Sequence, residues 1–423
     1  MTRSALQAAQ PFWNDGAMRI LHVVPSYLPA TRYGGPIFAV HGLCRALAAR
    51  GHHVEVFTTN VDGRSDSMVP LGVPVTLDGV RVRYFPSKIL RRLYWSPSLA
   101  RALAGETAGF DVVHLHSVFL WPTWVAARAA RKANVPYLIS PHGMLVKDLI
   151  RRRSQYVKFA WIHLLEKFNL KHASALHVTS DLEAAELMRF GWRLPRVAIV
   201  PIGIDEPEIA TATKPSKDVM KIVAVAEQPH VLFLGRLTWK KGLDRLLQAF
   251  ALTNHGSLVI VGPDDEGLVP QLSRLAQRLQ IADRIQFLSR TVVGADKEHL
   301  FAAARLFVLP SYSENFGMTV LEAMRRGLPV VVTPEVGAAA IVREAGGGLV
   351  TDGDPKAFSN AIERLISNFV VAQAMGDAGR RWVLEHYSWS RIAAQMEALY
   401  DRVTKSEGRR NPSANNTKIV QHA

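Results

Sequence analysis

The feature that most constrains this chain is a rhythm of short β-rich runs alternating with amphipathic helices, which occurs twice along the sequence. In the first series, buried strands are expected at residues 19–24, 53–58, 111–116, 137–140, 175–179 and 197–200. In the second series, they are expected at residues 231–234, 257–261, 284–288, 306–309, 329–332 and 348–351. Strands that alternate with helices indicate parallel sheets with helices on both faces. The sequence therefore predicts an α/β protein with two Rossmann-like domains.

The stretch between the two series, residues 205–228, is interpreted as a linker. It contains Pro207 and Pro215 and shows no clean helical or strand period. The final helix could cross back to the first domain. The predicted organisation is a flexible tail at 1–17, domains at 18–204 and 229–386, a C-terminal helix at 387–404 and a disordered tail at 405–423.

The composition narrows the class of protein. The chain has 423 residues, 48% of them hydrophobic, and one cysteine, Cys44, which excludes an intramolecular disulfide framework and a cysteine-based zinc finger. No uncharged apolar run reaches the roughly 18 residues that a membrane span needs. Residues 1–16 lack the hydrophobic block of a signal peptide. We expect a cytoplasmic protein that can still bind a membrane surface.

Nearly all of the excess positive charge lies in the first half of the chain. The net charge is +15, of which residues 1–204 carry +13 and residues 205–423 carry +2. The first half is therefore expected to meet an anionic partner, which could be nucleic acid, an anionic bilayer or a phosphate-bearing substrate. Two basic and aromatic segments, 91–95 and 151–171, suit a bilayer surface. A solvated helix whose aromatic residues pack into the core explains the second segment equally well.

Open parallel sheets bind ligands in the loops at the carboxyl ends of their strands, so these loops hold the candidate site. Gly235, Arg236 and Lys241 follow the strand at 231–234. A guanidinium and an ammonium at one strand end suit a diphosphate, and a glycine lets the backbone turn close to a ligand. The alternative is a solvated basic turn.

Two glutamates follow the strand at 306–309. Glu314 lies in the loop, and Glu322 lies eight positions later, in a helix expected to begin near Gly317. The free amides of a helix N-terminus attract anions, and carboxylates accept hydrogen bonds from vicinal hydroxyl groups. One glutamate could therefore hold a hexose and the other a ribose. In the alternative interpretation, Glu314 caps the helix and Glu322 lies on the surface.

Two loops of the first domain are weaker candidates. His142 follows the strand at 137–140 beside Gly143, where it could hydrogen-bond a sugar or a phosphate. A histidine in a structural role is the more frequent case. Gly34 and Gly35 open the first helix and can form an amide nest for a phosphate or sugar oxygen, or simply make a tight turn.

Several other motifs are absent or incomplete. No Gly-x-Gly-x-x-Gly, His-Glu-x-x-His or Gly-x-Ser-x-Gly motif occurs, and Leu268 stands where a nucleotide-triphosphate loop at 262–267 requires lysine. Asp352 and Asp354 match the Asp-x-Asp of metal-dependent sugar transferases. Because Pro355 follows, Asp354 is expected to cap a helix instead. We predict no catalytic metal.

The combination of motifs resembles the retaining glycosyltransferases of family 4, also called group 1. Its donor half is carried by Gly235-Arg236, Lys241-Gly242 and the pair Glu314 and Glu322. The resemblance covers roughly residues 19–402 and includes residues 34–35, 141–144, 179–180 and 200–205. It implies the GT-B fold, in which two Rossmann-like domains face each other across a cleft. One departure is Ile202, where the family usually has an asparagine.

The resemblance also implies a role for each matching residue. Arg236 and Lys241 would bind the diphosphate of a nucleotide sugar. Glu314 would bind the donor sugar and Glu322 the ribose, while His142 would face the reacting sugar from the first domain, which holds the acceptor. The remaining donor-binding positions are Gly34, Gly35, Gly235, Asn315, Phe316, Gly317 and Met318.

The implied function is transfer of a hexose, with retention of configuration, from a nucleotide-diphosphate sugar to a glycan or lipid-linked acceptor in cell-surface polysaccharide biosynthesis. No cofactor is implied, because the nucleotide sugar is a substrate. A nucleotide-sugar epimerase on the same fold is one alternative, and a basic nucleic-acid-binding protein is another. No recognised nucleic-acid-binding module occurs and the basic excess is confined to one half, so we expect no nucleic acid partner.

Overall fold

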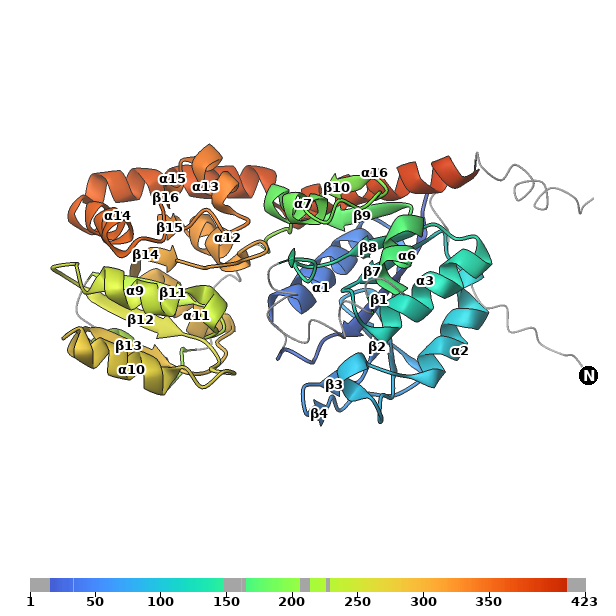
Figure 1. Cartoon of the computed structure of the whole chain (residues 1–423), viewed down its shortest axis with the longest axis horizontal. Coiled ribbons are helices and arrows are strands. Elements are labelled where there is room, and N and C mark those ends of the chain that lie inside the picture. The colour runs from blue at the N-terminus through green and yellow to red at the C-terminus, as the bar shows by residue number, and fades with distance from the viewer. Residues whose placement is uncertain are drawn as a thin grey trace, which may run out of the picture.

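The computed structural model describes residues 16–32, 34–147, 161, 165–205, 214–225 and 229–408. These residues form two α/β domains that lie side by side along the long axis of the molecule, and the chain passes between them twice (Figure 1). Of the tails expected at 1–17 and 405–423, residues 1–15 and 409–423 lie outside the described residues, as does most of the basic segment 151–171. The expected C-terminal tail begins too early, because residues 405–408 continue the last helix.

The first domain is built on an eight-stranded sheet. Its strand order is β10 (Val197–Ile199), β9 (Ala175–Val178), β8 (Tyr137–Ser140), β7 (Val112–His116), β1 (Arg19–Ser26), β2 (His53–Thr59), β6 (Val80–Phe85) and β5 (Pro74–Leu77). Its helices are α1 (Gly35–Ala49), α2 (Pro97–Glu106), α3 (Trp121–Ala133), α6 (Lys167–His172) and α7 (Asp181–Met188). All six predicted strands are present, and their neighbours in the sheet are parallel.

The sequence analysis missed β5 and β6 of this sheet, which pair antiparallel to each other. In β6 the buried Val80 and Val82 alternate with the exposed Arg81 and the half-buried Arg83. Such alternation is typical of an edge region with one face toward solvent, and it differs from the continuous apolar run of a strand that is covered on both faces. The first sheet is therefore mixed at one edge rather than wholly parallel.

The second domain is built on a six-stranded parallel sheet. Its strand order is β13 (Ile285–Leu288), β12 (Ser257–Val261), β11 (His230–Leu234), β14 (Ala304–Leu309), β15 (Val330–Val332) and β16 (Gly348–Val350). Its helices include α9 (Leu243–Phe250), α10 (Val269–Arg278), α11 (Gly294–Ala303), α12 (Met318–Arg325), α13 (Ala339–Ala345), α14 (Pro355–Ser367) and α15 (Phe369–His386). As predicted, Asp354 caps α14, because its carboxylate accepts hydrogen bonds from the amides of Lys356 and Ala357.

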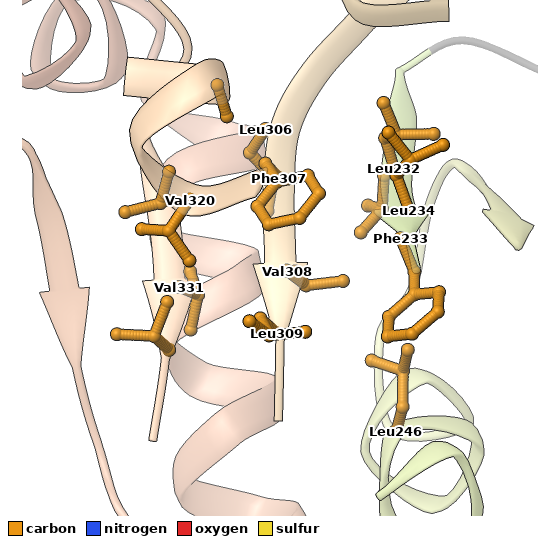
Figure 2. Packing of buried hydrophobic residues seen from close by; sticks show 14 of the residues in the cluster. Leu232, Phe233, Leu234, Leu246, Leu306, Phe307, Val308, Leu309, Val320 and Val331 are labelled. Atoms are coloured by element: carbon orange, nitrogen blue, oxygen red, sulfur yellow. The ribbon is translucent and has the colours of Figure 1, made fainter. Parts of the chain in front are cut away.

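The core of the second domain lies between its strands and helices. Figure 2 shows Phe233 on β11 and Phe307 on β14 packed among aliphatic side chains, and neither ring is exposed to solvent. Burying one such side chain stabilises the fold by about 1.5–3 kcal/mol. Because these strands are covered on both faces, they read as continuous apolar runs, which is why the sequence revealed them.

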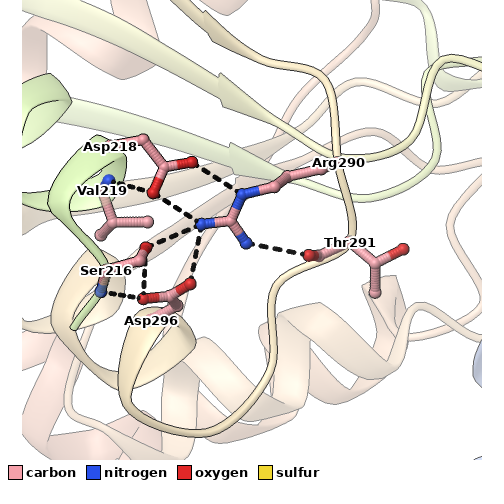
Figure 3. Close-up of polar contacts among 6 residues, drawn as sticks. All are labelled: Ser216, Asp218, Val219, Arg290, Thr291 and Asp296. Carbon is pink, nitrogen blue, oxygen red and sulfur yellow. Dashed lines mark hydrogen bonds and ion pairs between the residues drawn. The ribbon is translucent and has the colours of Figure 1, made fainter. Parts of the chain in front are cut away.

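The predicted linker at 205–228 contains a helix, α8 (Lys217–Val225), whose Val219 is fully buried in the core of the second domain. Figure 3 shows how the start of this helix is held. Arg290 Nε donates to Asp218 Oδ2 at 2.8 Å, and Arg290 Nη2 donates to Asp296 Oδ2 at 2.8 Å. The second half of the expected linker thus packs as part of the second domain.

The chain crosses between the domains at residues 201–205, here called the hinge, and again at 387–389. The amide of Ile204 donates to the carbonyl of Tyr387 at 2.8 Å, which ties the two crossings together. The last helix, α16 (Trp389–Gly408), then packs along α1 and buries Met396 and Tyr400 in the core of the first domain. Among the described residues we find no helix whose length and apolar character would let it span a bilayer.

Candidate active site

A cleft of about 1090 Å³ lies between the domains and is lined by residues of both. Every residue that the sequence analysis placed in the site lines this cleft. They are Gly34, Gly35, His142, Gly235, Arg236, Lys241, Glu314, Asn315, Phe316, Gly317, Met318 and Glu322. The structure therefore brings together side chains from loops that are nearly 300 residues apart in the chain.

The loop after β11 carries two of the predicted cations. Leu237 is fully buried, and its amide donates to the carbonyl of Pro263 at 2.9 Å, which anchors the loop between Arg236 and Lys241. The Arg236 side chain is exposed to the cleft. A methyl group on Gly34, at the start of α1, would lie 4.0 Å from Arg236 Nε, so the glycine loop of the first domain closely approaches this guanidinium.

Lys241 and Glu314 form an ion pair in the cleft, with Lys241 Nζ donating to Glu314 Oε2. Their side chains are 18% and 19% exposed, so both are largely shielded from bulk water. A shielded pair interacts more strongly than an exposed one because the local dielectric is lower. The pair holds an ammonium and a carboxylate at fixed positions on one wall of the cleft.

Backbone hydrogen bonds hold the loop from Glu314 to Gly317. The Glu314 amide donates to the Glu335 carbonyl at 3.0 Å, and the carbonyl of the buried Phe316 accepts from the Ala338 amide at 2.7 Å. Gly317, with φ of 92°, turns the chain into α12. Within the described part of the chain no side chain caps this helix, so its first amides are available to a ligand in the cleft.

Glu322 lies one turn further along α12 and keeps one oxygen free. Lys297 Nζ donates to Glu322 Oε1 at 2.7 Å, whereas Oε2 is buried without a hydrogen-bond partner among the described residues. A buried carboxylate oxygen without a donor is costly, so this oxygen is an unused acceptor at the wall of the cleft. Each of the two predicted glutamates therefore has its own lysine.

His142 faces the cleft from the first domain with φ of 52°. Its Nε2 lies 2.9 Å from Nδ1 of His116, which belongs to β7 beneath the cleft. Burial, reinforced by nearby His177, lowers the pKa of His142 to about 3. The imidazole is therefore neutral at physiological pH.

The sequence analysis missed the direct contact between the two domains around Asn315. Asn315 Nδ2 donates to Thr179 Oγ1 at 3.0 Å, and Ser180 Oγ donates to the Asn315 carbonyl at 3.0 Å. The buried carboxylate of Glu183 accepts from the amides of Gly143 at 2.7 Å and Thr179 at 2.9 Å. The sequence signal that could have pointed there is the pattern Ser180-x-x-Glu183, whose serine caps α7 while its glutamate turns toward the domain contact.

Arg325 is another cleft residue that was missed. It is 4% exposed, and its Nε and Nη1 atoms have no hydrogen-bond partner in the described part of the chain. Burial and the neighbouring Arg326 lower the pKa of Arg325 to about 10. Its position three residues after Glu322 on α12 could have pointed to the cleft, but nothing in the sequence revealed its burial.

Two Rossmann-like domains that face each other across a cleft, with cations and carboxylates at the strand ends, are the arrangement of the GT-B fold. Residues 34–203 match the family model "Glycosyl transferase 4-like domain", and residues 217–382 match "Glycosyl transferases group 1". Together the two matches span more than three quarters of the chain. The chain belongs to the group 1 glycosyltransferases, of the family 4 type.

Named relatives agree with this assignment. The chain is 28% identical to the D-inositol 3-phosphate glycosyltransferase of Xylanimonas cellulosilytica, over 92% of this chain and 97% of the relative. In fold it is similar to the sucrose-phosphate synthase of Thermosynechococcus elongatus, with a TM-score of 0.71, 24% identity and coverage of 92% and 100%. It is also similar to Anabaena HepE in complex with UDP and glucose, with a TM-score of 0.69, 20% identity and coverage of 91% and 100%.

Proposed function

We propose that this glycosyltransferase moves a hexose from a nucleotide-diphosphate sugar to a glycan or lipid-linked acceptor, with retention of configuration, in cell-surface polysaccharide biosynthesis. The observation that carries the proposal is the joint placement of Arg236, Lys241, Glu314 and Glu322 in one cleft, opposite His142. Two cations and two carboxylates at this spacing suit the diphosphate and the two sugars of such a donor.

The proposed leaving group is the nucleoside diphosphate, which Arg236 and Lys241 would bind. Breaking the anomeric carbon–oxygen bond leaves negative charge on the diphosphate. Preorganised donors at such a position typically contribute ~10²–10³ in rate for each hydrogen bond. With both cations in place, we propose that departure of the diphosphate requires no divalent ion.

The two glutamates would hold the two sugars of the donor. Glu314, fixed by Lys241, would accept hydrogen bonds from hexose hydroxyl groups, and the amides of Phe316, Gly317 and Met318 would reach the hexose and the phosphate. Glu322 would accept a hydrogen bond from the ribose through its unpartnered Oε2. These roles divide the cleft into a hexose end and a nucleoside end along α12.

The proposed course of the reaction is attack by the acceptor on the same face of the sugar from which the diphosphate leaves. The departing phosphate would take the proton of the acceptor hydroxyl, so no enzymatic nucleophile is invoked. His142 would contact the reacting sugar from the first domain. Closure of the domains around Asn315 would exclude water and limit hydrolysis of the donor.

Relatives suggest which substrates to test first. HepE is described in complexes with UDP-glucose, with UDP, and with UDP and glucose, which supports a UDP-sugar as the first donor to test. The acceptor would bind on the basic first domain. A cytoplasmic location and contact with an anionic membrane stay predictions; within the segment 91–95, Arg91 already binds Asp66 and the Ser65 carbonyl, which leaves less charge for a bilayer.

The test combines a ligand screen with paired variants. UDP, GDP, ADP and UDP-glucose should each be assayed by thermal shift, since a ligand that binds only the folded state at 100 times its Kd adds about 2.7 kcal/mol of stability. Lys241→Met and Glu314→Gln should abolish nucleotide release from the donor, whereas Lys356→Met, outside the cleft, should retain it. Full turnover by both cleft variants would refute the proposal, and an altered sugar formed without acceptor would favour an epimerase.

A further inference from the structure

Five histidines lie in or beneath the floor of the cleft on the first-domain side. His22 is on β1, His114 and His116 are on β7, His177 is on β9, and His142 follows β8. The first four are buried, and only His142 lines the cleft. Burial lowers the pKa of each ring, to about 3 for His22 and about 4 for His177. Each ring therefore carries one proton, on one of its two nitrogens.

The direction of one hydrogen-bonded chain follows from its last acceptor. The Val200 carbonyl can only accept, so His177 Nε2, at 2.9 Å, must carry the proton. His177 Nδ1 then accepts from Ser140 Oγ at 2.7 Å, and Ser140 Oγ accepts from His114 Nε2 at 2.7 Å. His114 Nδ1 must accept in turn from the Tyr400 hydroxyl at 2.7 Å. These hydrogen bonds allow only one tautomer for His177 and only one for His114, each with its proton on Nε2.

These hydrogen bonds make a metal ion among the histidine rings unfavourable. His22, His114 and His116 each place a ring nitrogen within 4.8 Å of the others, a spacing that a metal could accept. Both nitrogens of His114 are already used, one as donor and one as acceptor. Ligation by His114 would leave Ser140 or Tyr400 without its partner in the buried core, so hydrogen bonding accounts better for the cluster.

A second chain runs from the cleft inward. His142 Nε2 lies 2.9 Å from His116 Nδ1, and His116 Nε2 lies 2.9 Å from His22 Nδ1. Two directions satisfy these contacts. Either His22 donates to His116 and His116 donates to His142, or every proton shifts the other way.

The inner end of this chain decides between the two directions. His22 Nε2 is buried and has no hydrogen-bond partner among the described residues. In the inward direction this atom would be a buried N–H group without an acceptor, whereas in the outward direction it is only an unused lone pair. Orphaned buried N–H groups are rarer in folded proteins than under-used acceptors. The outward direction is therefore favoured.

We propose that His116, backed by His22, holds His142 in the tautomer with its proton on Nδ1, so that His142 offers a hydrogen-bond donor to the cleft and not a base. His142 Nδ1 has no partner among the described residues, which leaves its N–H group to a ligand. His116 and His22 act only through His142 and are positioning residues. Resting on the proposed function, the inference assigns this N–H group to an oxygen of the transferred sugar.

The tautomers can be read directly by NMR. Long-range nitrogen–proton correlation on protein with isotope-labelled histidine rings distinguishes a protonated from an unprotonated ring nitrogen, and His142→Asn identifies the signals of His142. We expect His142 to carry its proton on Nδ1 in the wild-type protein. His177 is the internal control, because the Val200 carbonyl requires its proton on Nε2. A wild-type His142 with its proton on Nε2 overturns the proposal.

A matched pair of variants tests the role of His116. In His116→Gln, the amide can still accept from His22 and donate to His142, whereas His116→Met has a similar shape and no donor. We expect the glutamine to preserve the tautomer of His142 and the methionine to release it to the Nε2 form. If His142 keeps its proton on Nδ1 in both variants, the role of His116 is overturned. If the methionine variant does not fold, the wild-type spectrum still decides the proposal.

Turnover of UDP-glucose supplies the functional readout. Loss of a preorganised donor should lower the kcat of His116→Met by roughly 10²-fold with little change in KM, while His116→Gln stays near the wild type. Equal kcat values for the two variants contradict the catalytic part of the inference. The NMR measurement needs no substrate, so its result is independent of whether the proposed transfer occurs.

Discussion

Trp389 holds the C-terminal helix α16 against the first domain, and removing its side chain should loosen that helix selectively. The indole is 8% exposed. A methyl group on Gly42 of α1 would lie 2.2 Å from Trp389 Cζ2, and one on Gly203 of the hinge would lie 2.5 Å from Cδ2. The ring therefore fills a slot that exists only because both facing positions are glycines.

The size of the effect follows from this packing. Truncating a buried aromatic side chain to alanine costs about 3–5 kcal/mol, because the removed atoms lose their burial and the slot stays partly empty. The slot lies between α1, the hinge and the first turn of α16, so the loss should appear as weaker docking of α16. At 1.4 kcal/mol for each factor of ten, it corresponds to roughly 100- to 4,000-fold more frequent opening of the helix.

Hydrogen–deuterium exchange of the α16 amides measures this opening in the folded protein. In Trp389→Ala these amides should exchange faster by that factor, while those of β11 and β14 in the second domain should change little. The control is Phe369→Ala, which removes an aromatic ring that is 58% exposed and should cost less than about 1 kcal/mol. Unchanged exchange of α16 in Trp389→Ala would refute the reasoning.

Three further outcomes are expected. Burial raises the pKa of Glu166 from 4.5 to about 7, so the folded protein binds this proton more tightly than the unfolded chain. The free energy of unfolding should therefore fall by about 3 kcal/mol as the pH rises from 4.5 to 7. Urea titrations of Glu166→Gln at the two pH values should no longer show this fall. Gly143 has φ of 72°, and a methyl group there would lie 2.7 Å from Asn315 Cβ. Gly143→Ala should therefore lower the free energy of unfolding in urea by at least about 1–2 kcal/mol. An unfolding midpoint in urea equal to that of the wild type would count against the domain contact. Arg325→Met removes a buried guanidinium whose Nε and Nη1 have no hydrogen-bond partner among the described residues, so it should raise the free energy of unfolding by about 1–3 kcal/mol. A lower free energy of unfolding in urea would show that the guanidinium stabilises the fold.

Much of the fold could be predicted because buried parallel strands have an unmistakable pattern. Strands such as β12 and β14 are covered on both faces, so they appear as uninterrupted apolar runs between turn residues. The strand β6 was not predicted because Arg81 and Arg83 alternate with its buried valines, so it shows no continuous apolar run. Helix α8 was not predicted because few of its residues are buried and because Pro207, Pro215 and Pro229 flank it in the sequence.

The candidate cleft residues could be predicted because topology gathers them. The carboxyl ends of parallel strands meet at one edge, so a residue such as Lys241 after β11 and one such as Glu314 after β14 must lie close together. Contacts that depend on how the two domains meet have no such rule. The hydrogen bond between Ser180 and the Asn315 carbonyl joins residues 135 positions apart.

A crystal structure of the chain with UDP-glucose tests the central claim most directly. We expect the diphosphate oxygens within hydrogen-bond distance of Arg236 and Lys241, the hexose hydroxyl groups at Glu314, and a ribose hydroxyl at the free oxygen of Glu322. A nucleotide bound outside the cleft, or bound within it without contact to these four side chains, would contradict the proposed function.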